Sequence, residues 1–227
     1  MLQHRPADAR GHVKFGWLDT WHTFSFGSYH DPRYMGHSVL RVINDDFIRA
    51  HSGFDTHGHR NMEILTCMLQ GTLSHRDSMG HHRTLQSGEW QMLSAGQGIT
   101  HSEMNHGDID VHLLQIWLHP QQDETEPCYQ QKTFDPKPGM TLIASPDAHD
   151  DSFKIGQDVY VWQGRIAAGT VELPSSAKRL GWLHVIQGEL GTHGLVLNPG
   201  DGLAITHEQA LTLQVTQAAE FIFFDLP

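Results

Sequence analysis

The sequence predicts an all-β protein built from two stacked antiparallel barrels. Short apolar segments alternate with glycine-containing turns from residue 63 to residue 98, and a similar series returns between residues 180 and 205. Helical signals are sparse along the chain. Short strands at regular spacing, with turn signals between them, are typical of sandwiches and barrels. The repetition of the unit favours two barrels of about a hundred residues each over one large barrel.

The first copy of the unit gives the expected strands in order. We expect strands over residues 64–69, 72–77 and 85–93, because each segment has strand composition and is bounded by turn residues. The turns are Gln70-Gly71, Ser78-Met79-Gly80 and the stretch 94–98. A further strand is expected at 115–118, whereas Asn44-Asp45-Asp46 is interpreted as a turn whose side chains cap backbone groups.

The second copy aligns with the first through its glycines. Placing Gly188 on Gly71 gives an offset of 117 residues, and Pro199-Gly200-Asp201 then corresponds to Ser87-Gly88-Glu89. Polar and proline-rich stretches at 121–127 and 134–139 break both strand and helix patterns. We therefore expect an N-terminal barrel over residues 1–130 and a C-terminal barrel over residues 131–227.

Composition excludes several kinds of partner. The 227 residues include 15 basic and 26 acidic ones, and the net charge of −11 disfavours direct binding to nucleic acid or to acidic membrane surfaces. The sequence shows neither a membrane-spanning apolar run nor a secretory signal, so we expect a cytoplasmic protein. Cys67 and Cys128 have no paired spacing, which leads us to expect a monomer or weak dimer without a disulfide.

Two short segments combine residue types that bind transition metals. The first contains His57 and His59, and the second contains His101 and Glu103. Alternate residues of a β-strand share a face, so two strands can bring three imidazoles and a carboxylate to one point. Such ligands suit a divalent transition metal. One His-x-His pair alone would mean little among 19 histidines, because histidines on a strand rim give the same pattern.

The spacing leaves the choice of carboxylate open. Both Glu63 and Glu103 lie an even number of residues from a histidine of the pair beside them, so strand alternation would put either one on the ligand face. A glutamate that is not a ligand could still hold a ligand imidazole through its other ring nitrogen. The alternative role for Glu63 is a salt bridge with Arg60.

The second copy of the unit has no equivalent of these ligands. The offset of 117 residues places Pro174, Ser176 and Leu180 at the positions of the two histidines and of Glu63. None of these side chains binds transition metals in the way imidazole does. The metal site is therefore expected in the N-terminal barrel only.

Two ordered segments surround the candidate ligands, Gly53-x3-His57-x-His59-x3-Glu63-x7-Gly71 and Gly88-x5-Ser94-x-Gly96-x4-His101-x3-Asn105. They resemble the two motifs of the cupin superfamily. A longer series consists of Gly16-Trp-Leu-Asp-Thr-Trp-His-Thr-Phe-Ser-Phe-Gly27, Asp31-Pro, Leu40-Arg-Val-Ile-Asn-Asp-Asp46, His57-x-His59-Arg, Ser94-Ala-Gly-x-Gly-Ile-x-His101-Ser-Glu103, Gln115-Ile-Trp117, Ala144-Ser-Pro-Asp and Phe224-Asp-Leu-Pro227. This series resembles the pirin family more specifically, and the resemblance covers nearly the whole chain. It implies a bicupin with two jelly-roll-like barrels.

The pirin resemblance also implies a ligand set and an activity. It places the family's three histidines and one glutamate at His57, His59, His101 and Glu103. Family members have been described as quercetin 2,3-dioxygenases, so the expected reaction opens a flavonol such as quercetin with O2. Fe(II) is the expected metal, with Cu, Ni, Co, Mn or Zn as alternatives.

Two further roles follow from this expected reaction. The catalytic role, taking up the proton of the substrate hydroxyl, would fall to Glu103. Phe24, Phe26 and Met104 would shape a slot for the small aromatic substrate.

Two other functions remain open. Animal pirins are described as iron-dependent nuclear coregulators, so the same ligands could serve a non-enzymatic metal or redox sensor that binds a protein partner. A cupin isomerase or zinc hydrolase fits less well, because four protein ligands leave less open coordination than three. The chain departs from the family in having Gly58 where proline is common between the two histidines, which makes the strand less stiff but changes no ligand.

Overall fold

The computed structural model describes residues 1–174, 176–207 and 210–227, and within them the protein is almost entirely β-strand. The chain forms two compact units. The N-terminal unit comprises Gly11–Gly36 and Leu40–Phe134, and the C-terminal unit comprises Met1–Arg10, His37–Val39 and Asp135–Pro227. Within these ranges no helix has the length and apolar character needed to cross a membrane. The predicted all-β class with two barrel domains is confirmed.

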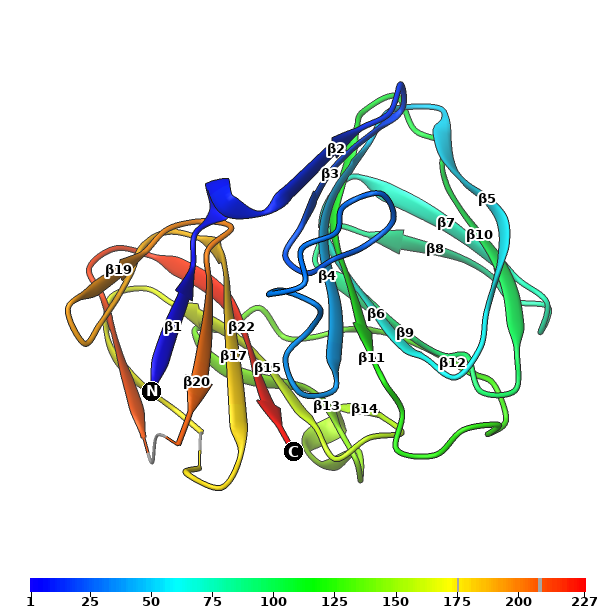
Figure 1. The fold of residues 1–227 in the computed structure, drawn as a ribbon. Helices are drawn as coiled ribbons and strands as arrows, with labels where there is room; N and C mark the ends of the chain where they lie inside the picture. The colour runs from blue at the N-terminus through cyan, green and yellow to red at the C-terminus, as the bar shows by residue number, and fades with distance from the viewer. Residues whose placement is uncertain (175, 208–209) are drawn as a thin grey trace. The chain divides into compact units, whose positions relative to one another are not determined.

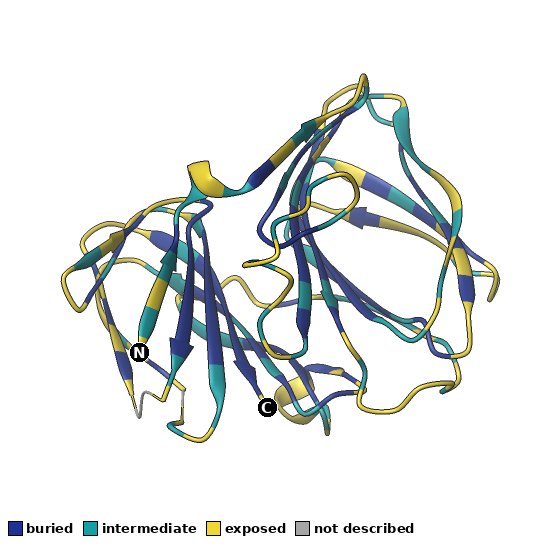
Figure 2. Ribbon diagram, in the orientation of Figure 1, coloured by how far each residue is buried: buried dark blue, intermediate teal, exposed yellow. Residues whose placement is uncertain are grey.

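The N-terminal unit consists of two sheets that face each other (Figure 1). Its strands are β2 (Gly11–Lys14), β3 (Leu18–His22), β4 (Leu40–Ile48), β5 (Ser52–His59), β6 (Glu63–Gln70), β7 (Thr72–Asp77), β8 (His82–Gln86), β9 (Glu89–Ser94), β10 (Ile99–Asn105), β11 (Val111–Leu118) and β12 (Cys128–Thr133). The seven-stranded sheet has the order β12-β9-β6-β11-β4-β3-β2, and the four-stranded sheet has the order β5-β10-β7-β8. Buried residues recur along these strands, whereas the connecting loops are mostly exposed (Figure 2).

The C-terminal unit repeats this arrangement. Its elements are β1 (Leu2–Arg5), η1 (Ala7–Ala9), β13 (Gly139–Ser145), η2 (His149–Asp151), β14 (Phe153–Lys154), β15 (Tyr160–Ile166), β16 (Gly169–Leu173), β17 (Leu180–Gln187), β18 (Leu190–Thr192), β19 (Leu195–Leu197), β20 (Gly202–Thr206), β21 (Leu211–Val215) and β22 (Ala219–Leu226). The seven-stranded sheet has the order β1-β20-β17-β22-β15-β13-β14, and the four-stranded sheet has the order β16-β21-β18-β19. Each central strand therefore has a counterpart in the N-terminal unit.

The aligned glycines occupy equivalent turns in the two units. Strand β17 begins and ends 117 residues after β6, as the repeat predicts. Gly71 follows β6 with a φ of 83°, and Gly188 follows β17 with a φ of 79°. Only glycine adopts this left-handed backbone at little cost, so a glycine marks the same turn in both copies.

We expect Gly188→Ala to lower the free energy of unfolding by about 2 kcal/mol or more. A Cβ at this position would lie 2.4 Å from the backbone oxygen of Ala218, in addition to the unfavourable φ. Gly16→Ala is the matched control, because Gly16 has no heavy atom within 4 Å of its would-be Cβ and no positive φ. Urea denaturation of the three proteins measures the effect. Equal stability of both variants would contradict the assignment of this turn.

The units do not divide the chain at a single point between residues 130 and 131. Strand β12 extends across that position and pairs along its whole length with β9 of the N-terminal unit. At the other end of the chain, β1 pairs with β20, so Met1–Arg10 joins the C-terminal unit. Composition does not show that β12 belongs to the N-terminal unit or that Met1–Arg10 belongs to the C-terminal unit, because strand pairing joins segments that are distant in sequence. The polar stretch 121–127 precedes β12 and the stretch 134–139 follows it.

The segment Asn44-Asp45-Asp46 is not a turn, and that expectation was wrong. It lies in the middle of β4, which pairs with β3 on one side and β11 on the other. The side chains of Asn44 and Asp46 are buried. The Asp45 side chain lies on the opposite face of the strand, with its Oδ1 2.7 Å from Nε2 of His112. Sheet pairing on both sides therefore outweighed the turn preference of three consecutive Asn and Asp residues.

Candidate metal centre

The inner face of the N-terminal unit carries a polar layer next to apolar ones. On β6, Ile64 and Met68 belong to two separate apolar clusters, and Thr66 lies between them on the same face of the strand. The Thr66 hydroxyl donates to Gln115 Oε1 on β11 at 2.8 Å and accepts from Gln91 Nε2 on β9 at 2.9 Å. The seven-stranded sheet thus presents a hydrogen-bonded polar row toward the barrel interior.

The four-stranded sheet brings the three predicted histidines together. Strands β5 and β10 are antiparallel neighbours, and their register places His57 opposite His101. His59 shares the face of His57, so the three ring centroids lie 4.5 to 4.9 Å apart. One ligand nitrogen from each ring lies within 4.8 Å of the others. Strand alternation and antiparallel pairing together form this three-imidazole group.

The unused ring nitrogens fit a metal ligand set. His101 is buried, and neither of its ring nitrogens has a hydrogen-bond partner. His57 uses Nδ1 in a 2.7 Å contact with the backbone oxygen of Asp55, which leaves Nε2 available. Buried polar atoms are normally paired, so the two nitrogens of His101 indicate a group that the protein is built to bind.

Burial keeps two of the imidazoles neutral. It lowers the pKa of His59 to about 4, and the neighbouring rings of His101 and His57 act in the same direction. Burial likewise lowers the pKa of His101. Neutral imidazole is the form that binds a metal, so these rings need not lose a proton to bind one at neutral pH.

Glu103 lies next to this group as a buried carboxylate. Its side chain is 1% exposed, and it accepts hydrogen bonds from Gln91 Nε2 at 2.5 Å and from Gln115 Nε2 at 3.2 Å. Burial alone would raise the pKa of Glu103, but the rings of His75 and His101 and the Gln91 amide lower it to about 2. The carboxylate is therefore charged and held in place by donors from the opposite sheet.

The sequence interpretation missed His75, which the structure places beside Glu103. Strand β7 pairs with β10, and His75 lies directly opposite Glu103. His75, His101 and Glu103 form a second group whose ligand atoms lie within 4.8 Å of one another, so His101 belongs to both groups. His75 Nε2 lies 3.0 Å from Asp77 Oδ2, which in turn lies 3.0 Å from Nδ1 of the partly exposed His81. The sequence signal that could have identified His75 was its position two residues before Asp77 in a predicted strand, because alternate residues of a strand share a face.

Glu63 lies in a different sheet from the histidines, so strand alternation does not connect it to them. The chain leaves β5 at His59, turns through Asn61 with a φ of 51°, and enters β6 of the seven-stranded sheet. Ser94 Oγ donates to Glu63 Oε2 at 2.7 Å. Arg60 pairs with Glu124, its Nε lying 2.8 Å from Oε1. An argument from parity holds only within one continuous strand, and it was wrong for Glu63.

A cavity of about 360 Å³ is separated from the histidines by aromatic side chains that pack against them. Its lining residues are Val13, Phe15, Trp17, Leu18, Thr20, His22, Phe26, Gly27, Ser28, Asn44, Asp46 and Phe54. Phe54 packs against His57 at 6.2 Å between ring centroids, and Phe26 packs edge-on against Trp117, which packs edge-on against His59. The volume and the mainly apolar wall are typical of a small-molecule site.

Only one of the three residues expected to shape the aromatic slot lines this cavity. Phe26 lies in its wall, whereas Phe24 is buried in the core and Met104 lines another hollow with Arg76 and Arg83. Met104 and Glu103 are adjacent on a strand and point to opposite sides, which excludes Met104 from the inner face. Trp17 and Phe54 supply the aromatic wall instead.

Asp46 makes stability depend on pH. Burial raises its pKa to about 7, and the charges of Asp45 and Glu103 act in the same direction. In the unfolded chain an aspartic acid has a pKa of about 3.9. Between these values the folded protein holds a proton that the unfolded chain releases. The contribution of Asp46 is complete below about pH 4 and is lost as the pH rises through 7.

We expect Asp46→Asn to remove this pH dependence, because an amide does not ionise. Relative to the unsubstituted protein, the stability of the variant should rise by roughly 2.5 kcal/mol between about pH 5 and pH 8. Urea denaturation of metal-free protein across this range measures the difference. A stability difference that stays constant with pH would mean that Asp46 ionises alike in the folded and unfolded protein.

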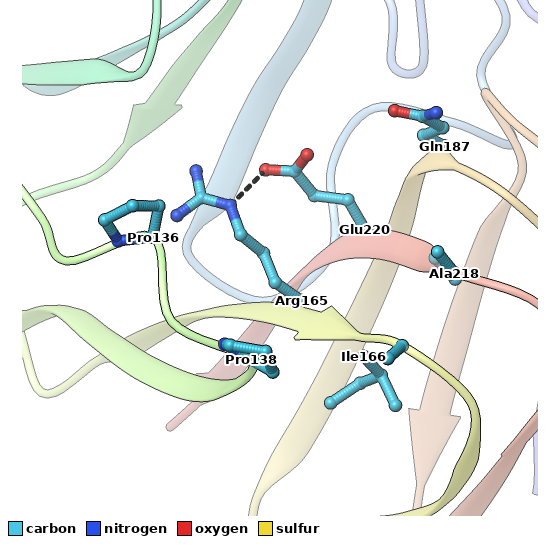
Figure 3. A pocket seen from close by; sticks show the side chains of 9 residues that line it. Pro136, Pro138, Arg165, Ile166, Gln187, Ala218 and Glu220 are labelled. Atoms are coloured by element: carbon cyan, nitrogen blue, oxygen red, sulfur yellow. Dashed lines mark hydrogen bonds and ion pairs between the residues drawn. The ribbon is translucent and has the colours of Figure 1, made fainter.

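The C-terminal unit has a cavity of a different kind (Figure 3). It measures about 290 Å³, and its wall includes Pro136, Pro138 and Ile166. Its charged members, Arg165 and Glu220, neutralise each other through an ion pair of 3.0 Å. Among the residues that the structure describes, both metal-capable groups lie in the N-terminal unit.

The fold and the imidazole group define a cupin protein of two domains with the chemistry of a divalent-metal site in its first barrel. The family model for pirin matches residues 3–118, and the model for the quercetinase C-terminal cupin domain matches residues 142–226. This chain belongs to the pirin family, as its sequence motifs predicted.

Several relatives are similar over their full length. The chain is 44% identical over 229 residues to the quercetin 2,3-dioxygenase of Escherichia coli strain K12, covering all of this chain and 99% of that protein. It is 44% identical to a putative quercetin 2,3-dioxygenase of Pasteurella multocida, with 100% of both chains covered. A pirin-like protein of Caulobacter vibrioides is 34% identical, with 99% of each chain covered.

Solved structures show the same fold. The structure of YhhW from Escherichia coli matches with a TM-score of 0.98 at 44% identity, covering 100% of this chain and 98% of that one. The bacterial pirin YhhW in complex with nickel(II), also from Escherichia coli, matches with a TM-score of 0.97 at 44% identity, covering 100% and 99%. The predicted bicupin fold is confirmed.

Proposed function

We propose that this protein is a metal-dependent dioxygenase that opens a flavonol such as quercetin with O2. The observation that carries the proposal is the imidazole group, with a buried carboxylate beside it, in which His57 packs against Phe54 from the aromatic wall of a cavity. The relatives named quercetin 2,3-dioxygenase support it. A planar aromatic substrate would lie in this cavity with one hydroxyl directed at the metal.

We propose His57, His59, His101 and Glu103 as the metal ligands. They supply three imidazoles and one charged oxygen, a set that suits a divalent transition metal. Fe(II) is the proposed metal, and Cu, Ni, Co, Mn and Zn are the alternatives. A bound metal would supply Lewis acidity for a substrate hydroxyl and the redox chemistry of O2.

Glu103 is the proposed acceptor of the substrate hydroxyl proton. Its pKa of about 2 keeps it charged at neutral pH, and two amide donors fix its orientation. His75 Nδ1 lies 3.9 Å from Glu103 Oε1, and hydrogen bonds continue from His75 through Asp77 to the partly exposed His81. If the contact between Glu103 and His75 shortens to a hydrogen bond during the reaction, this series of groups can pass a proton between the buried site and solvent. The aromatic cavity wall would exclude water from the reacting atoms.

The direct test of this activity measures the release of carbon monoxide. Quercetin is added without oxygen to metal-loaded protein, air is admitted, and carbon monoxide is assayed against His57→Ala protein treated in the same way. We expect release from the unsubstituted protein only. Equal release from both proteins, or none from either, would contradict the proposed activity. A metal-dependent protein partner in the absence of flavonol turnover would favour a regulatory function.

Metal analysis of protein purified without a chelating resin tests the proposed Fe(II). We expect about one iron per chain. Stoichiometric nickel, zinc or copper in its place would replace Fe(II) as the native metal. The same ligands would remain assigned, because affinity for these ions depends on availability as well as on ligand type.

We also propose a cytoplasmic monomer or weak dimer that does not bind nucleic acid or membranes directly. Cys67 is buried, Cys128 is exposed, and both are free cysteines. The net charge of −11 opposes binding to polyanions. Light scattering with size-exclusion chromatography tests the assembly, and a covalent dimer on a non-reducing gel would contradict the prediction.

A further inference from the structure

The cavity beside the histidines has one polar wall. It is formed by Thr20 and His22 on β3 and by Asn44 and Asp46 on β4. The register pairs Thr20 with Asp46 and His22 with Asn44, so all four residues belong to adjacent cross-strand pairs. His22 Nδ1 lies 2.7 Å from Asn44 Oδ1. Pockets that bind small molecules commonly combine an apolar wall with a few polar groups that fix orientation.

Asp46 is the acidic residue of this wall. Asp46 is only 3% exposed, and the cavity lining contains no lysine or arginine. Burial disfavours its ionised form, a side-chain hydrogen bond with Thr20 favours it, and the negative charges of Asp45 and Glu103 disfavour it. Burying a carboxyl group without a cation is costly unless its polar atoms are used. Buried carboxyl groups that are desolvated in this way at the wall of a cavity are typical of residues that bind a ligand.

The polar wall is connected to the proposed metal ligands through β11. Asn44 is the cross-strand partner of Gln115, whose amide donates to Glu103 at 3.2 Å. On the aromatic side, Phe54 connects the cavity to His57. The lining of the cavity contains none of the proposed metal ligands, so we place the outer part of a metal-bound substrate in it, toward β3 and β4.

We propose that Asp46 is a specificity-determining residue that hydrogen-bonds a second hydroxyl of the aromatic ligand, away from the hydroxyl at the metal. This inference rests on the proposed function and narrows its substrate class to planar aromatics with a hydroxyl on an outer ring. The physical reason is that a ligand with that hydroxyl adds a hydrogen bond to a buried carboxyl that has only a side-chain bond with Thr20 against its desolvation, whereas a ligand without it adds none.

The test compares two probes, quercetin and 3-hydroxyflavone. Both have the hydroxyl proposed to face the metal, but only quercetin has hydroxyls on its outer rings. Their dissociation constants are measured by calorimetry on metal-loaded protein under argon, so that no turnover occurs. The variants are Asp46→Leu, which removes the carboxyl at similar volume, and Asp46→Asn, which keeps a polar group. Asp45→Asn is the matched control from the opposite face of β4.

We expect the unsubstituted protein to bind quercetin more tightly than 3-hydroxyflavone. Asp46→Leu should weaken quercetin binding about 10- to 100-fold and change 3-hydroxyflavone binding less than about threefold. Asp46→Asn should give a smaller loss that is again specific to quercetin, and Asp45→Asn should change neither. Metal content and circular dichroism of each variant establish that the site and the fold are retained.

The possible failures are distinguishable. If Asp46→Leu weakens both probes equally, or neither, the role of Asp46 is overturned while the proposed function stands. If Asp46→Leu does not fold, Asp46→Asn decides: a loss specific to quercetin supports the inference, and unchanged discrimination overturns it. If the unsubstituted protein binds neither probe, the proposed function fails, and the inference fails with it.

Discussion

Replacing His101 with alanine is expected to abolish both metal binding and flavonol turnover. His101 is the residue shared by the two metal-capable groups, and both of its ring nitrogens are buried without a hydrogen-bond partner. Its removal deletes a proposed metal ligand and disrupts both groups, so we expect metal content below about a tenth of the normal value. Turnover should fall more than about 100-fold, because losing a group that merely supports a ligand already costs about 10- to 100-fold.

The matched control for this variant is His112→Ala. His112 is a histidine of β11 that contacts Asp45 at 2.7 Å and belongs to neither metal-capable group. Metal content by mass spectrometry and carbon monoxide release are measured for both variants at equal protein concentration. A His101→Ala protein that retained full metal content would refute the proposed site, whatever its activity.

Replacing Glu103 with alanine should also empty the site, whereas Glu63→Ala should keep metal bound at saturating metal and lower metal affinity or turnover by at most about 10- to 100-fold. Glu103 is a buried charged carboxylate beside His101, so the substitution removes a proposed ligand together with the acceptor of two amide hydrogen bonds. Glu63 lies on a strand of the other sheet and accepts from Ser94. The two variants thus test whether Glu103 or Glu63 is the carboxylate ligand.

The comparison requires that both variants fold. Each substitution removes a few atoms and creates no large cavity, so circular dichroism should match that of the unsubstituted protein. The reverse order of effects, with Glu63→Ala free of metal and Glu103→Ala fully occupied, would move the carboxylate assignment to Glu63. The three histidines would keep their assignment in that case.

The sequence predicted the elements whose signals are local. Glycines with positive φ bound the strands, so Gly71 and Gly188 located the same turn in each copy. The motif resemblance to pirins is confirmed by the family models and the full-length relatives. Alternation within single strands correctly paired His57 with His59, and His101 with Glu103, because side-chain direction in a strand depends only on position.

Local signals failed where the chain changes sheets or pairs on both sides. The parity argument for Glu63 failed at the turn through Asn61, after which the chain continues in the other sheet. The turn signals of Asn44 and Asp46 were outweighed by pairing on both edges of β4. No local signal indicated that β1 pairs with β20 and so belongs to the C-terminal unit.

The sequence by itself determined the fold class, the repeat and the two histidine pairs, because each depends on neighbouring residues in one strand or turn. The tertiary structure alone decided which side chains surround them. His75 is opposite Glu103 through the register of β7 and β10, and Gln115 reaches the same carboxylate from the facing sheet. Asp46 joins the cavity wall through the pairing of β3 with β4. Such contacts join residues far apart in the chain, and strand register fixes them only when the whole barrel closes.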